Sequence, residues 1–166
     1  MILRLLLPPF IFIPIMIAQI YFIPIIEISG IVPNLLIILI AYYTLQEGQL
    51  FGMVFAFFVG FIFDLSTGSI IGASMLSGVI AAFSLGFFYN ENKADSYIRN
   101  PFFPLFVLLG CFINSAIFNL IANFNVNLSF SAIILFSAFL PALYTAFLGA
   151  VAALIFDGLG VRKRIG

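Results

Sequence analysis

Histidine and tryptophan are absent from this chain of 166 residues, and cysteine occurs once, at Cys111. The lack of histidine removes the commonest metal ligand and a frequent general base of enzymes. A single cysteine excludes an intrachain disulfide, and the apolar sequence around Cys111 predicts a small buried side chain. The chain therefore lacks the residue types on which most catalytic and metal sites depend.

Charge is also scarce. Charged residues make up 7% of the chain, whereas soluble proteins contain about 25%. Hydrophobic residues make up 64% and the mean hydropathy is +1.30, so we expect the chain to lie in a lipid bilayer. The six basic and six acidic residues cancel, and the longest basic run is Arg162-Lys163-Arg164. Nucleic-acid binding is excluded because it requires a basic surface.

Motifs of known enzyme and transporter chemistry are missing as well. The sequence has no paired carboxylates, no ligands at metal-binding spacing, no activated nucleophile and no Walker or dinucleotide glycine pattern. A proton- or ion-coupled transporter needs ionisable side chains near the middle of the bilayer, and the pattern places none there. We expect no enzyme activity, no cofactor and no bound metal.

Long apolar segments predict an all-α membrane protein, with six transmembrane helices in one compact bundle and a single domain over residues 1–166. The predicted spans are 5–26, 33–45, 50–63, 70–89, 101–121 and 131–156. The first is longer than a signal-peptide core and is expected to stay uncleaved. The second and third are shorter than the usual span of about 20 residues. Tilted, bilayer-thinning or re-entrant helices are therefore open alternatives, as is a five-span chain with one long helix.

The basic residues give an independent indication of topology. With six spans, Arg4, Lys93, Arg99 and the basic run at 162–164 all fall on one side of the membrane. Cytoplasmic loops carry an excess of lysine and arginine, so both termini are predicted to be cytoplasmic. Five spans would place Arg4 on the opposite side from the other five basic residues.

Small residues recur at every fourth position of the stretch 48–72. This small-residue row consists of Gly48, Gly52, Ala56 and Gly60, and the same spacing continues through Asp64 to Gly68 and Gly72. A second row lies in the sixth predicted span and consists of Ala138, Ala142, Ala146 and Ala150. Small residues at this spacing let two membrane helices approach closely. Both rows are candidate sites for helix packing within the bundle or for binding of a separate protein.

Three polar side chains in or near the predicted spans are further candidates. Asp64 follows Gly48 by a helical rise of about 24 Å, which places it near the outer boundary of the membrane. Its carboxylate is expected to cap the next helix or the Ser66-Thr67 turn; the alternative is contact with a partner or solute on the outer face. Asn114 and Asn119 could line a cavity that opens outward, and interhelical hydrogen bonds would explain them equally well.

Two segments resemble the MreD family of bacterial inner-membrane proteins that determine rod shape. Residues 33–43 resemble that family's P-[DN]-L-L segment, which ends in aromatic residues. The family's glycine-rich segment with its aspartate is matched in order by Gly48, Gly52, Gly60, Phe61, Asp64, Ser66, Gly68, Ser69, Gly72 and Leu76. Asn34 stands where many family members have aspartate.

The resemblance implies a non-enzymatic membrane scaffold of the cell-elongation machinery, which builds peptidoglycan. Its partners would be an MreC-like bitopic membrane protein and, through it, MreB, RodA and a class B penicillin-binding transpeptidase. The resemblance also implies a six-helix fold similar to the substrate-binding subunits of energy-coupling-factor vitamin transporters, and such a subunit is the alternative function. A vitamin-binding subunit would carry an alanine-rich face on its first helix, where this chain has only Ala18.

Overall fold

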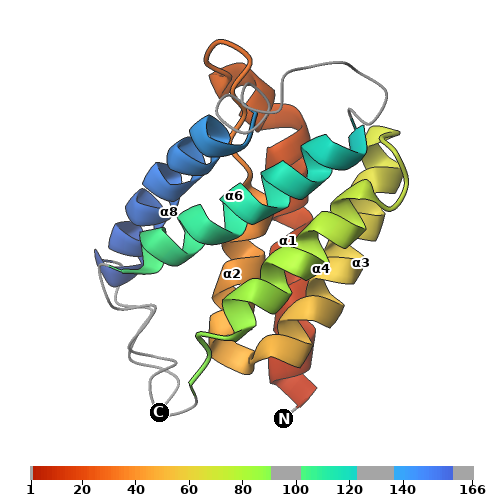
Figure 1. Cartoon of the computed structure of the whole chain (residues 1–166). Helices are drawn as coiled ribbons and strands as arrows, with labels where there is room; N and C mark the ends of the chain where they lie inside the picture. The colour runs from red at the N-terminus through yellow and green to blue at the C-terminus, as the bar shows by residue number, and fades with distance from the viewer. Residues whose placement is uncertain (1, 91–101, 123–136, 159–166) are drawn as a thin grey trace.

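The computed structural model describes residues 2–90, 102–122 and 137–158, with side chains for 8, 10–90, 102–122 and 137–151. Within these ranges the protein is all-helical, with six α-helices and no strand. This confirms the all-α class. The helices lie side by side in a bundle and alternate in direction along the chain (Figure 1).

Each of the six predicted segments overlaps one α-helix, with ends that differ by up to several residues. The helices are α1 (Ile2–Ile17), α2 (Leu35–Glu47), α3 (Gln49–Thr67), α4 (Ala73–Gly86), α6 (Phe103–Ala122) and α8 (Leu140–Gly158). After α1 the chain continues through a π-helical turn, Ala18–Phe22, and a 3-10 turn, Ile23–Ile26. Residues 131–136 of the sixth predicted segment lie outside the described residues.

The helical structure is interrupted between α2 and α3 at Gly48. Its φ of +102° lies in the region that favours glycine. The Gly48 N–H donates to the Thr44 carbonyl at 3.2 Å, and the Gly48 carbonyl accepts from the Gly52 N–H at 3.0 Å. One residue therefore closes the last turn of α2 and opens the first turn of α3. The structure has two helices here, in place of the single long helix of the five-span alternative.

Helix α3 extends four residues beyond the predicted end at 63. The Ser66 hydroxyl donates to the Ile62 carbonyl at 2.7 Å, and the Thr67 hydroxyl donates to the Phe63 carbonyl at 2.9 Å. These polar side chains are satisfied by the helix's own carbonyls and do not form a turn. Asp64, which follows the predicted end of this span, therefore lies inside α3.

Two of the helices, α3 and α6, are long and apolar enough to cross a membrane, with 19 and 20 residues. Their rise of about 28–30 Å matches a hydrocarbon core of about 30 Å. Helices α2 and α4 have 13 and 14 residues and reach about 20 Å. That all six helices span the bilayer remains a prediction.

The surface of the bundle is more apolar than that of a typical soluble protein, although the core is also mainly apolar. Large apolar side chains are widely exposed, including Ile25 at 77% and Leu50 at 74%. Buried positions include polar side chains such as Gln19, Thr44 and Thr145. Exposed apolar patches and buried polar groups are the informative departures from the usual pattern, and together they suit a surface that faces lipid.

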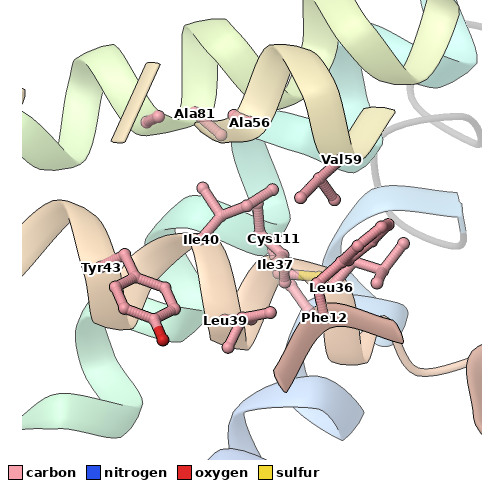
Figure 2. Packing of buried hydrophobic residues seen from close by; sticks show 12 residues of the cluster. Phe12, Leu36, Ile37, Leu39, Ile40, Tyr43, Ala56, Val59, Ala81 and Cys111 are labelled. Carbon is pink, nitrogen blue, oxygen red and sulfur yellow. The ribbon is translucent and has the colours of Figure 1, made fainter. Parts of the chain in front are cut away.

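The core is packed around α2, which contacts every other described α-helix. Its buried side chains Leu36, Ile37, Leu39, Ile40 and Tyr43 belong to one cluster with side chains of α1, α3, α4, α6 and α8. Figure 2 shows these α2 side chains between Phe12 of α1 and the close pair Ala56 and Ala81, where α3 meets α4. Small side chains at that crossing bring the two helix backbones close together.

Candidate functional site

The small-residue row forms a single buried face as far as Asp64. All five of its members within this range are buried: Gly48, Gly52, Ala56, Gly60 and Asp64. Helix α3 packs mainly against α4 and, to a lesser extent, against α2. The row therefore contacts helices of its own chain.

Two glycines of the row mark the closest approaches. A Cβ atom added at Gly60 would lie 2.6 Å from the backbone N and Cα of Met75 in α4. A Cβ atom added at Gly52 would lie 2.7 Å from Cβ and 2.9 Å from Cα of Thr44 in α2. Real Cβ atoms do not come this close to other heavy atoms, so any side chain at either position would push the helices apart.

Gly68 and Gly72 have a different role from the rest of the row. Gly68 ends α3 with φ +64°, and Gly72 precedes α4 with φ +99°. A Cβ atom at either position would meet nothing within 4 Å. Glycine is favoured at these two positions by the left-handed backbone conformation and not by close packing.

Asp64 links α3 to the beginning of α4. One carboxylate oxygen, Oδ2, accepts from the Gly72 N–H at 2.9 Å and from the Ser74 N–H at 3.2 Å. The other, Oδ1, accepts from the Ser69 hydroxyl at 3.0 Å and from the Ser74 N–H at 3.3 Å. The side chain is fully buried.

These bonds make Asp64 the N-terminal cap of α4, supplied by the preceding helix. The first N–H groups of a helix have no partner inside it and carry a partial positive charge. A carboxylate at that place satisfies the N–H groups and is itself stabilised by them. The sequence suggested that Asp64 caps either the next helix or the Ser66-Thr67 turn, and in the structure it caps the next helix. Ser66 and Thr67 bond within α3.

The second row, which we call the alanine row and which begins just before α8, packs against a different helix from the small-residue row of α3. Ala138, Ala142 and Ala146 are buried and Ala150 is half-buried. Helix α8 packs mainly against α6, and Ala142 belongs to the same cluster as Cys111 of that helix. The two rows therefore do not form one shared interface.

A hydrogen-bonded junction holds the start of α2. The Asn34 side chain accepts from the N–H groups of Leu36 and Ile37 at 3.1 and 3.2 Å, which makes it the N-terminal cap of α2. The Asn34 backbone N–H donates to Thr145 Oγ1 of α8 at 2.9 Å. Gln19 donates to the Pro33 carbonyl at 3.0 Å and accepts from the Leu35 N–H at 2.7 Å.

This junction joins three segments that are far apart in the sequence, namely the π-helical turn, the start of α2 and α8. Our sequence analysis missed it. The partners Asn34 and Thr145 are 111 residues apart, and no local pattern predicts such a pair. The P-[DN]-L-L segment indicates only one part of the junction, the cap at Asn34, because asparagine and aspartate before an apolar run are typical helix caps.

Replacing Asn34 tests the capping role. Asn34→Ala is expected to lower the free energy of unfolding by about 1 kcal/mol, because two N–H groups of α2 lose their acceptor. Asn34→Asp should stay close to the wild type, since aspartate is an equally good cap. Unfolding of both variants in a mixed-micelle titration would measure the difference. Equal losses in the two variants would contradict the cap.

A partly open cavity of about 680 Å³ lies between the helices, near the 29–34 segment, the C-terminal part of α6 and the start of α8. Both predicted lining residues, Asn114 and Asn119, are in its wall. Asn119 donates to the Ser115 carbonyl at 2.8 Å and to the Ser137 carbonyl at 3.0 Å, and so joins α6 to the residues before α8. Whether the cavity opens towards the outer side of the membrane remains a prediction.

The acidic side chains and the cysteine of the described residues lie apart from one another or are bonded within the bundle. Within residues 8, 10–90, 102–122 and 137–151, no three His, Cys, Asp or Glu side chains lie close enough together to hold a metal ion. Glu27 and Glu47 are exposed, and Asp64 is bonded through both oxygens. Cys111 is buried, as predicted, and its sulfur donates to Thr145 Oγ1 at 3.4 Å.

Comparison with protein families settles the relationship that the two segments suggested. The chain matches the family of the rod shape-determining protein MreD over residues 1–157. The chain belongs to the MreD family. The match includes both small-residue rows, the Asp64 cap and the junction at Asn34. No curated protein and no solved structure matches the chain, so the likeness to vitamin-transporter subunits remains a prediction.

MreD membership supports an involvement of this chain in the determination of rod shape. MreD proteins are shape-determining membrane proteins, and the apolar helices α3 and α6 agree with a membrane location. In this MreD chain Gly52, Gly60 and Asp64 contact other helices of the bundle, and a role of the two rows in binding a partner remains a prediction. Asn114 and Asn119 line a cavity between the helices, and Asn119 also links α6 to Ser137.

Proposed function

We propose that this chain is a non-enzymatic integral membrane scaffold of the bacterial cell-elongation complex. It would bind an MreC-like bitopic membrane protein and, through it, act with MreB, RodA and a class B penicillin-binding transpeptidase in peptidoglycan synthesis. The observation that carries the proposal is the match to the MreD family over residues 1–157.

The structure also has features that a scaffold needs. The glycine contacts of α3 and the caps at Asp64 and Asn34 fix the helices relative to one another. The outer faces of the helices stay apolar and unoccupied by other parts of the described chain, as at Phe10, Phe57 and Phe58. A single apolar helix of a bitopic partner would pack against such a face within the bilayer.

We place the chain in the inner membrane as a multi-pass protein with both termini cytoplasmic. The start of α1, the end of α4, the start of α6 and the end of α8 lie at one end of the bundle (Figure 1). In the sequence, all six basic residues are in or next to these helix ends, as the positive-inside rule requires of the cytoplasmic side. Reporters fused to the two termini should both report the cytoplasm, and opposite locations would contradict six spans.

The cavity favours a second candidate function, the substrate-binding subunit of an energy-coupling-factor vitamin transporter. Its volume of about 680 Å³ lies within the range of small-molecule pockets, about 300–1,000 Å³. Against this candidate, α1 lacks the alanine-rich face of such subunits, and the alanine row is in α8 instead.

Purification of the tagged chain from its own membranes distinguishes the two functions. The scaffold proposal expects a bitopic membrane protein of the MreC kind to co-purify in mild detergent, identified by mass spectrometry. An unrelated tagged multi-pass protein from the same membranes is the control for non-specific capture. Recovery of an ATPase module and a bound vitamin, without the bitopic protein, would overturn the scaffold proposal and support the transporter subunit.

A further inference from the structure

The cavity is built by the fold as a whole. The 29–34 segment, α2, α3, α4, α6 and the start of α8 all contribute to its wall. Because its wall comes from packed helices as well as a loop, the cavity is formed before any ligand arrives. Pre-formed cavities of this size with a few polar groups on an apolar wall are typical of small-molecule sites.

One side-chain amide of the wall is available for a ligand. The Gln19, Asn34 and Asn119 side chains are already bonded to backbone groups. Within the described part of the chain, no hydrogen bond engages the Asn114 side chain, which is half-buried in the cavity wall. Its amide offers two donors and one acceptor oxygen.

The wall is neutral. No described residue that lines the cavity is charged. The Asp64 carboxylate is bonded through both oxygens to the 69–74 segment. A charged ligand would lose its hydration here without gaining an opposite charge, which is strongly unfavourable.

Two aromatic side chains complete the wall. Phe63 of α3 and Phe118 of α6 line the cavity together with the Asn114 amide. Aromatic and apolar surface holds the less polar face of a small ring, while an amide fixes its orientation. The cavity therefore combines apolar surface, neutral hydrogen-bonding groups and no countercharge.

We propose that this cavity binds an uncharged small molecule that carries hydroxyl and amide groups, as an N-acetylated sugar does, and that Asn114 hydrogen-bonds it. The proposal does not depend on the scaffold function, because it uses only the chemistry of the cavity wall. It assigns to Asn114 a role that packing of the bundle does not require.

The test uses the full chain in lipid nanodiscs, without sugar-based detergent that would compete for the site. The probe is N-acetylglucosamine, and glucosamine is its control because the same ring carries a protonated amine in place of the amide. Ligand-observed saturation-transfer NMR should show saturable binding of N-acetylglucosamine at concentrations up to about 10 mM, and at least about tenfold weaker binding of glucosamine. No saturable binding, or equal binding of both sugars, would overturn the proposal.

Variants of Asn114 test whether the sugar binds in the cavity. Asn114→Leu removes the amide at similar size and should weaken binding about tenfold, whereas Asn114→Gln keeps an amide and should retain most of the affinity. Leu120→Ala changes an exposed residue of α6 outside the cavity wall and should leave binding unchanged. Because the Asn114 side chain makes no hydrogen bond to the described chain, Asn114→Leu should keep the wild-type melting temperature without ligand. Undiminished binding in Asn114→Leu would overturn the assignment.

Discussion

Gly60→Leu is expected to prevent the α3–α4 hairpin from closing and to leave the protein unfolded or aggregated after extraction. The site has no room even for a Cβ atom, which would lie 2.6 Å from the backbone of Met75. Backbone cannot move aside as the end of a flexible side chain can, so the two helices must separate. Monodispersity in size-exclusion chromatography after mild detergent extraction measures the effect.

Other substitutions in α3 test whether the lack of space at Gly60 causes the loss of folding. Gly60→Ala should still fold and lose about 1–3 kcal/mol of unfolding free energy, the usual cost of overpacking. Val54→Leu adds bulk on the exposed face of α3 and should behave as the wild type. A monodisperse Gly60→Leu variant with wild-type stability would show that α3 and α4 do not pack as described. Gly52→Leu, next to Thr44, should resemble Gly60→Leu.

Asp64→Ala is expected to lower the free energy of unfolding by about 2–4 kcal/mol. The substitution removes the cap of α4, worth up to about 2 kcal/mol, and leaves the Gly72 and Ser74 N–H groups without their acceptor. Both N–H groups are at the start of a helix, where no carbonyl of the same helix reaches them. Equilibrium unfolding in a mixed-micelle titration measures the loss.

Two comparisons separate capping from charge. Asp64→Asn keeps one oxygen that can accept from the α4 N–H groups, so it should lose less than Asp64→Ala. Glu47→Ala removes an exposed carboxylate at the end of α2 and should change stability by less than about 0.5 kcal/mol. If Asp64→Ala were as mild as Glu47→Ala, the cap at Asp64 would contribute little to the fold.

The sequence predicted the features that depend on local pattern. Apolar segments located the six helices, and the polar residues 46–49 located the break that Gly48 makes between α2 and α3. The buried setting of Cys111 also followed from its neighbours in sequence. Such features depend on residues a few positions apart, so their signal is contained in a short stretch of chain.

Features that depend on distant contacts were not predictable in the same way. The end of α3 was placed too early because Ser66 and Thr67 were interpreted as turn residues, although their hydroxyls bond back to carbonyls one turn earlier. The bond from Asn34 to Thr145 needs α8 to pack beside the start of α2. The positions of Asn114 and Asn119 in a cavity wall were proposed from their polarity, but the other walls come from helices whose packing no single stretch specifies.

The position of the Asp64 partners has a consequence for the order in which the chain assembles. They are all 5 to 10 residues further along the sequence, whereas α6 begins only at Phe103. During synthesis, a hairpin of α3 and α4 can close as soon as the beginning of α4 has emerged, because loops this short form within nanoseconds to microseconds. The hydrogen bonds of the carboxylate require only residues of this hairpin, so they do not depend on α6 or α8 having been translated.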